Sequence, residues 1–195
     1  KRIFILYDKE WNNLIHKINK IDITNIQDLV NLSILVDLLI VAEDHRFKSH
    51  YGVDILALIR AFWKTFFCKR REGASTIAMQ LVRTIRGNYE LSIFRKISEI
   101  FLALKLTKSI SKKKITLLYL SVAYYGWDMH GLKQACIKLN LNIDKLSSTE
   151  AASLVARLKY PEPKKKSKYR EEQINKRTIY ILNRYSKIRE EIGTI

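Results

Sequence analysis

Residues 43–52 read Glu-Asp-His-Arg-Phe-Lys-Ser-His-Tyr-Gly, the densest polar stretch of the chain. From Leu29 to Ala42 the apolar content rises, which predicts a buried helix that leads into Glu43. Asp54 stands where the N-cap of a second helix is expected, because apolar residues then recur at helical spacing. The acidic pair 43–44 is therefore predicted at the edge of a core. A carboxylate there can serve as a general base, although a capped helix end with surface charges explains the local sequence about as well.

Helical periodicity continues downstream and predicts further helices at about 76–86, 92–107, 111–124 and 151–158, with a last amphipathic helix around 174–188. The core stripe of the helix at 92–107 is assigned to Ile93, Ile97, Ile100, Phe101 and Leu104. Its other side carries Arg95, Lys96 and Glu99. The stretch up to about residue 31 shows no clear period, and no segment reads as a confident strand. The predicted fold class is mainly α.

The composition calls for an anionic partner. The 195 residues include 36 Lys and Arg against 19 Asp and Glu, a formal net charge of +17. Six Gly and two Pro are too few for a fold of many short strands, which again favours long helices. A helical nucleic-acid-binding domain would suit the charge, but no binding motif supports it, so no nucleic-acid partner is predicted. The chain begins with Lys1, so we expect that an N-terminal segment has been removed, with any membrane anchor in it.

Four short motifs, in matching order and spacing, resemble those of the peptidoglycan glycosyltransferases, glycosyltransferase family 51. They are 43–52 (Glu-Asp-x-x-Phe-x-x-His-x-Gly), 73–80 (Gly-Ala-Ser-Thr-Ile-Ala-Met-Gln), 95–99 (Arg-Lys-Ile-Ser-Glu) and, in part, 112–121. The resemblance covers roughly residues 30–185. Ala74, Met79 and Ser121 depart from the family's usual residues, as do the later motifs. A divergent transferase acting on another polyprenyl-pyrophosphate-linked glycan, or a non-catalytic binder of such glycans, is therefore the alternative.

The resemblance implies a lysozyme-like helical fold with a large lobe and a smaller, membrane-touching jaw. It implies a single glycosyltransferase domain over 1–195, with the jaw at approximately 55–86. The implied activity is inverting polymerisation of lipid II, an undecaprenyl-pyrophosphate disaccharide-peptide, at the outer face of the bacterial cytoplasmic membrane. Carried over by motif, Glu43 is the base for the acceptor 4-hydroxyl. The second catalytic glutamate is Glu99, which orients the donor or assists the pyrophosphate, directly or through a metal.

A pyrophosphate leaving group needs positive charge, which arginine and lysine side chains on the polar helix faces supply. The predicted substrate-binding residues are Asp44, Phe47, His50, Ser75, Thr76, Gln80, Arg83, Arg95 and Lys96. A divalent cation, Mg²⁺ or Mn²⁺, is expected to bind with the pyrophosphate and not by direct protein ligation. Three more modest interpretations stay open: a surface ion pair of Arg95 with Glu99, a structural hydrogen bond of His50 next to Glu43, and packing of Phe47 under the cleft.

The helix at 55–67 has an apolar face that Trp63 and Phe67 make wider than a core-facing helix needs, with basic residues beside it. This pattern favours shallow insertion into an anionic membrane surface. The competing interpretation is a helix buried on two sides.

Overall fold

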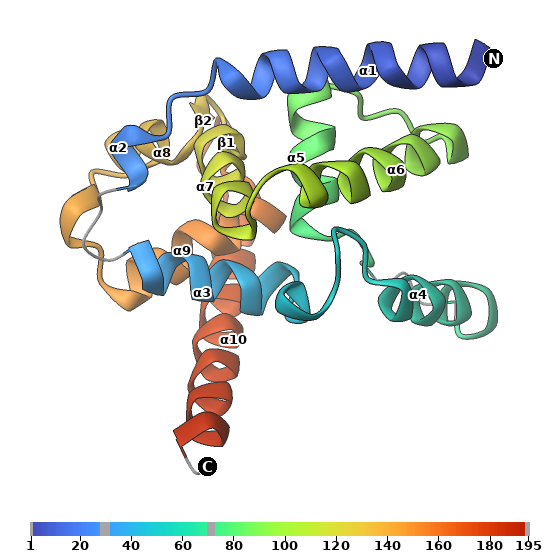
Figure 1. Ribbon diagram of the computed structural model, residues 1–195. Coiled ribbons are helices and arrows are strands. Elements are labelled where there is room, and N and C mark those ends of the chain that lie inside the picture. The colour runs from blue at the N-terminus through green and yellow to red at the C-terminus, as the bar shows by residue number, and fades with distance from the viewer. Residues whose placement is uncertain (1, 28–31, 70–72, 194–195) are drawn as a thin grey trace. The chain divides into compact units, whose positions relative to one another are not determined.

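The computed structural model describes residues 2–27, 32–69 and 73–193. The chain is mainly α-helical, as predicted, and forms two compact units (Figure 1). The first unit comprises Lys1–Ile21 and Glu43–Tyr119, and the second comprises Asp22–Ala42 and Leu120–Ile195. No described helix combines the length and the apolar content needed to cross a bilayer. The lobe-and-jaw arrangement and the jaw at 55–86 stay predictions.

The first unit is built from helices with one short 3₁₀ turn. Its elements are α1 (Arg2–Asn19), η1 (Phe47–Ser49), α4 (Ile55–Phe67), α5 (Ile77–Arg86), α6 (Ile93–Ser109) and most of α7 (Lys112–Val122). At the centre lies α5, whose apolar residues Ile77, Ala78, Met79, Leu81 and Val82 are fully buried, while Ile85 is half-buried. Thr76 caps its first turn by accepting a hydrogen bond from the backbone of Met79, and Gly87 ends it with a positive φ.

Helix α1 was not predicted, because the stretch up to about residue 31 was interpreted as having no clear period. Its inner face nevertheless buries Leu14 and Ile18. The carboxylate of Glu10 ties the helix to its neighbours, since it accepts hydrogen bonds from Arg86 of α5 (2.7 Å) and Ser98 of α6 (2.7 Å). Trp11, Leu14 and Ile18 recur at helical spacing, so a periodic signal was present and these tertiary contacts add to it.

The predicted core stripe of α6 is wrong. Ile93, Ile97 and Phe101 are exposed, and Ile100 and Leu104 are only half-buried. The buried face instead carries Leu102, Ala103 and Leu106 together with Glu99. The helix is apolar on both sides, so periodicity alone could not choose between them.

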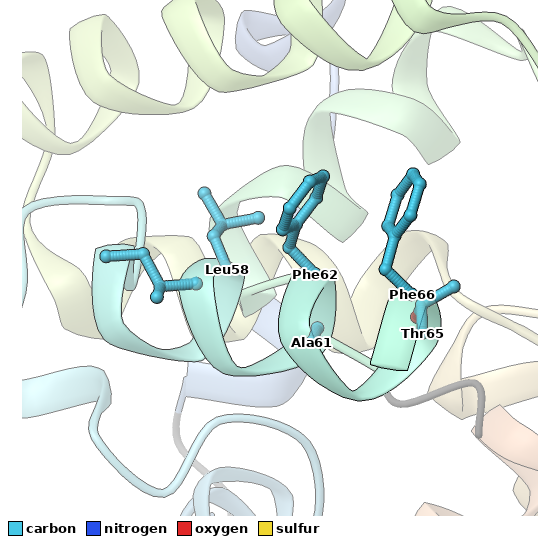
Figure 2. Close-up of a pocket in the computed structure, with 6 residues that line it drawn as sticks. Leu58, Ala61, Phe62, Thr65 and Phe66 are labelled. Carbon is cyan, nitrogen blue, oxygen red and sulfur yellow. The ribbon is translucent and has the colours of Figure 1, made fainter. Parts of the chain in front are cut away.

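Helix α4 begins as predicted, with the Asp54 side chain accepting a hydrogen bond from the backbone of Ala57. Only Ala57 and Ala61 of this helix are buried, so it is not buried on two sides. Figure 2 shows Leu58, Phe62 and Phe66 projecting from one side of α4, where they line a shallow apolar groove. Trp63 and Phe67 stack on one another and are also exposed.

The second unit contains a small antiparallel hairpin among helices. Its elements are α2 (Thr24–Gln27), α3 (Leu32–Glu43, whose last residue belongs to the first unit), β1 (Tyr124–Gly126), β2 (Met129–His130), α8 (Leu132–Lys138), η2 (Ile143–Lys145), α9 (Ser148–Lys159) and α10 (Lys168–Gly193). The hairpin corrects the expectation of no strand and of a helix reaching residue 124. Gly126, the last residue of β1, and Gly131, which follows β2, both have a positive φ. A capping box of Ser147 and Glu150 starts α9.

Candidate active site

Glu43, at the end of α3, is partly buried and its carboxylate is oriented by a chain of side chains. The amide Nε2 of Gln80 donates to Glu43 Oε2 at 3.1 Å, and the hydroxyl of Tyr119 donates to the Oε1 of Gln80. Burial, and then the charge of Glu43, raises the pKa of Tyr119, so its hydroxyl stays protonated and remains a donor. Because Tyr119 takes the amide oxygen, the amide NH₂ must face Glu43.

Asp44 does not share this environment, because its carboxylate is buried and both of its oxygens are hydrogen-bonded to other groups of the protein. One oxygen lies 2.8 Å from His50 Nε2, and the other accepts a hydrogen bond of 3.1 Å from the backbone of Ile77. His50 is therefore a structural partner as expected, but its partner is Asp44 and not Glu43. The pair fixes the loop after Glu43 to the first turn of α5.

The loop from 44 to 52 is held by further contacts of the motif residues. The hydroxyl of Thr76 donates to the backbone oxygen of Gly52 at 2.6 Å. Lys112 Nζ donates to the backbone oxygens of Phe47 (2.7 Å) and Lys48 (2.9 Å). Gly52 has a φ of +89°, and a Cβ there would lie 2.4 Å from a backbone oxygen of α6. Only glycine fits this close approach.

Four predicted substrate-binding side chains are consequently not available to a substrate in this structure. They are buried and bonded or packed inside the first unit: Asp44, Phe47, His50 and Thr76. Their geometry supports a role in shaping the loop that carries Glu43.

A second group of motif residues meets around Glu99, whose side chain is fully buried. Arg83 of α5 donates to both carboxylate oxygens, at 3.0 and 3.3 Å, and Arg95 donates to one of them. Lys96 Nζ lies 3.8 Å from the carboxylate. We call these four residues the Glu99 cluster. Three cations surround one carboxylate, so the cluster keeps an excess of positive charge.

Ser75 contacts two of the cations of the Glu99 cluster. Its hydroxyl oxygen lies 2.7 Å from Lys96 Nζ and 3.1 Å from the guanidinium of Arg83. Burial is the largest cause that lowers the pKa of Lys96; Glu99 opposes it, Arg83 and Arg95 add to it, and together these effects bring the pKa to about 8. Keeping Lys96 charged in this place therefore costs free energy, as is typical of a cation in an anion-binding site.

Gln80 and Arg83 lie three residues apart on α5, so they share one face of the helix, about 5 Å apart along its axis. Gln80 reaches Glu43, while Arg83 reaches Glu99. Side chains of a single helix, α5, thus contact both the partly buried carboxylate of Glu43 and the Glu99 cluster.

The sequence model described as Transglycosylase matches residues 12–186. This chain belongs to the transglycosylase family. It is 33% identical over 130 residues to a monofunctional glycosyltransferase of Staphylococcus saprophyticus, covering 63% of this chain and 48% of that protein. It is 36% identical over 156 residues to penicillin-binding protein 1A of Neisseria flavescens, covering 77% of this chain and 19% of that protein. For penicillin-binding protein 1A of Escherichia coli, the identity is 34% over 129 residues, covering 65% and 15%.

The transglycosylase chain therefore matches about half of the monofunctional relative and less than a fifth of either penicillin-binding protein. The family is one of peptidoglycan glycosyltransferases, which act in bacterial cell-wall synthesis.

The Glu99 cluster does not form a set of ligands for a divalent cation. Three positive groups already occupy the carboxylate, and no group of three His, Cys, Asp or Glu side chains among the described residues could hold a metal ion. A metal would also face the repulsion of the cations. The binding of Mg²⁺ or Mn²⁺ together with the pyrophosphate stays a prediction.

Two residues of this transglycosylase site were not among the predicted site residues. Lys112 donates to the backbone of the loop, and Tyr119 donates to Gln80, which contacts the carboxylate of Glu43. The available signal was their place in the partly matched fourth motif. Nothing in helical periodicity distinguishes a tyrosine that packs from one that donates to Gln80.

Proposed function

We propose that this transglycosylase is an inverting glycosyltransferase that polymerises lipid II, with Glu43 as the general base. The observation that supports this most directly is the pairing on α5. One face of that helix orients a partly buried carboxylate through Gln80 and binds the cation cluster through Arg83. A polymerase that must remove one proton and release one pyrophosphate needs these two functions close together.

In the proposed reaction, the carboxylate of Glu43 takes the proton from the 4-hydroxyl of the acceptor sugar. The resulting oxygen nucleophile attacks the anomeric carbon of the donor from the face opposite the pyrophosphate. The bond between that carbon and the pyrophosphate oxygen breaks, and its electron pair leaves with undecaprenyl pyrophosphate. Attack from the opposite face inverts the anomeric configuration. The hydrogen bond from Gln80 would keep the carboxylate aimed at the acceptor.

The developing charge on the pyrophosphate would be stabilised by Arg83, Arg95 and Lys96. Arginine offers two parallel donors to phosphate oxygens, and lysine offers a compact charge. Because Glu99 is fully buried beneath these cations, we propose that it is a positioning residue. Direct contact of Glu99 with substrate, which the motif implied, is not part of this mechanism.

The exposed apolar face of α4 supports a membrane partner. Its aromatic side chains face solvent, and Arg60 and Lys64 lie on the same helix. Such a helix can lie in the interface of an anionic bilayer. We propose that it brings the site to the outer surface of the cytoplasmic membrane, where a lipid-linked substrate is presented.

The decisive experiment is polymerisation of labelled lipid II by the wild-type chain and by Glu43→Gln. We expect glycan product from the wild type and a rate lower by about 10²-fold or more from the variant, because proton abstraction is lost. Glu172→Gln, at an exposed position of α10, is the matched control. Near-normal turnover by Glu43→Gln would remove Glu43 as the base. Turnover of another polyprenyl-linked sugar, but not of lipid II, would replace the substrate and keep the chemistry.

A further inference from the structure

The loop before α6 and the first turn of that helix expose a concentrated group of apolar side chains. Leu91 is 99% exposed, Phe94 85% and Ile93 77%, the highest values among the large apolar residues of the described chain. Tyr89 and Ile97 beside them are also exposed. We call residues 89–94 the α6 tip. The side chains of Leu91, Ile93 and Phe94 make no hydrogen bond or ion pair with Glu43 or the Glu99 cluster among the described residues.

The shape of the α6 tip decides between possible partners. Side chains that are almost completely exposed project from the surface and do not line a groove. A protein partner needs a shape-matched area of about 800 Å² on each side, whereas acyl chains adapt to any projecting side chain. The chain's net charge of +17 also suits an anionic surface.

We infer that the α6 tip inserts into an anionic lipid bilayer, as a contact separate from α4. Both elements belong to the first unit, and both lie toward the right of Figure 1. Ile97 and Phe101 continue the apolar face of the tip along α6, so the contact follows the outer side of the helix. The buried side of the same helix holds the Glu99 cluster.

Insertion of the α6 tip would fix the depth of the Glu99 cluster relative to the lipid headgroups. This step rests on the proposed function. Arg95 and Lys96 directly follow Phe94, and their side chains turn inward to Glu99 and Ser75. With Phe94 at the level of the upper acyl chains, these cations lie at headgroup level. A pyrophosphate attached to a lipid is presented at that same level, so the tip would align the cations with the leaving group.

The first test is binding to vesicles of equal parts phosphatidylglycerol and phosphatidylcholine. We expect the double variant Leu91→Ser/Phe94→Ser to partition about tenfold more weakly than the wild type, because two large apolar side chains are lost from the interface. The control is Tyr169→Ser/Ile179→Ser, which removes two exposed apolar side chains of α10. Circular dichroism of each variant checks that the helices are retained. Equal partitioning of the tip variant and the control would overturn the inference.

The second test reads insertion directly at position 94. Phe94→Trp is placed in a chain whose native tryptophans, Trp11, Trp63 and Trp127, are replaced by Phe. Brominated acyl chains should quench its fluorescence, and an absence of quenching in vesicle-bound protein would overturn the inference. A companion chain keeps Trp63 alone and reports α4 separately. Polymerisation in detergent micelles tests the proposed function without a bilayer, so its failure is distinguishable from failure of the tip to insert.

Discussion

Replacing Glu99 by Gln tests whether a buried carboxylate holds the cation cluster together. The substitution keeps the side-chain size and removes the negative charge. In the structure, Glu99 is fully buried and its carboxylate is contacted by Arg83 at 3.0 Å, by Arg95, and by Lys96 at 3.8 Å. The variant would leave three cations facing one another around a neutral amide.

The expected loss of stability follows from burial. Removing one partner of a buried ion pair costs about 3–5 kcal/mol. The three cations keep 11–31% of their side-chain surface exposed, and the amide can still accept a hydrogen bond, so water and the amide offset part of this cost. We expect a loss of about 2–3 kcal/mol. For a chain of this size, that corresponds to a Tm lower by about 4–12 °C.

Thermal unfolding followed by circular dichroism at pH 7 measures this change, with Glu172→Gln of α10 as the exposed control. The control should stay within about 0.5 kcal/mol of the wild type. If Glu99→Gln had the same Tm as that control, Glu99 would not stabilise the cluster, and the proposal that Glu99 is a positioning residue would be wrong.

Three further predictions concern the charge, the loop and the membrane. Because Lys96 has a pKa of about 8, the affinity for inorganic pyrophosphate should fall as pH rises through that value. In Lys96→Arg the fall should disappear, since arginine stays charged; an unchanged pH profile would exclude Lys96. Gly52→Ala should cost about 2–4 kcal/mol in a melting experiment, because its Cβ would meet a backbone oxygen at 2.4 Å. Gly73→Ala, with no atom within 4 Å of the added carbon, should not destabilise. Trp63→Asp or Phe67→Asp should weaken vesicle binding with the fold intact, and unchanged binding by both would count against insertion of α4.

Much of the first unit could be predicted because its signals are local. Asp54, Thr76 and Ser92 each accept a hydrogen bond from the backbone three residues later, and such caps depend only on nearby chain. Helix α1 was missed although its apolar residues recur at helical spacing, and its contacts with α5 and α6 join residues more than 60 positions apart.

The same limit applies inside the candidate site. Motif order brought Glu43, Gln80, Arg83 and Glu99 into one list, but it could not say which of them touch. Tyr119 orients Gln80, which in turn donates to Glu43, and His50 bonds with Asp44. These pairings join residues of different helices and loops, so spacing along the chain carries no record of them.

The sequence by itself determined that this protein is helical, basic and a transglycosylase, because caps, periodicity, charge and motif order are all properties of neighbouring residues. Only the tertiary structure decided which face of α6 is buried. Both faces are apolar, so periodicity could not choose between them. The side with Leu102, Ala103 and Leu106 is buried, and Glu99 on that side has Arg83, Arg95 and Lys96 as partners. Ile93 and Phe94 lie on the exposed side, where we propose the membrane contact.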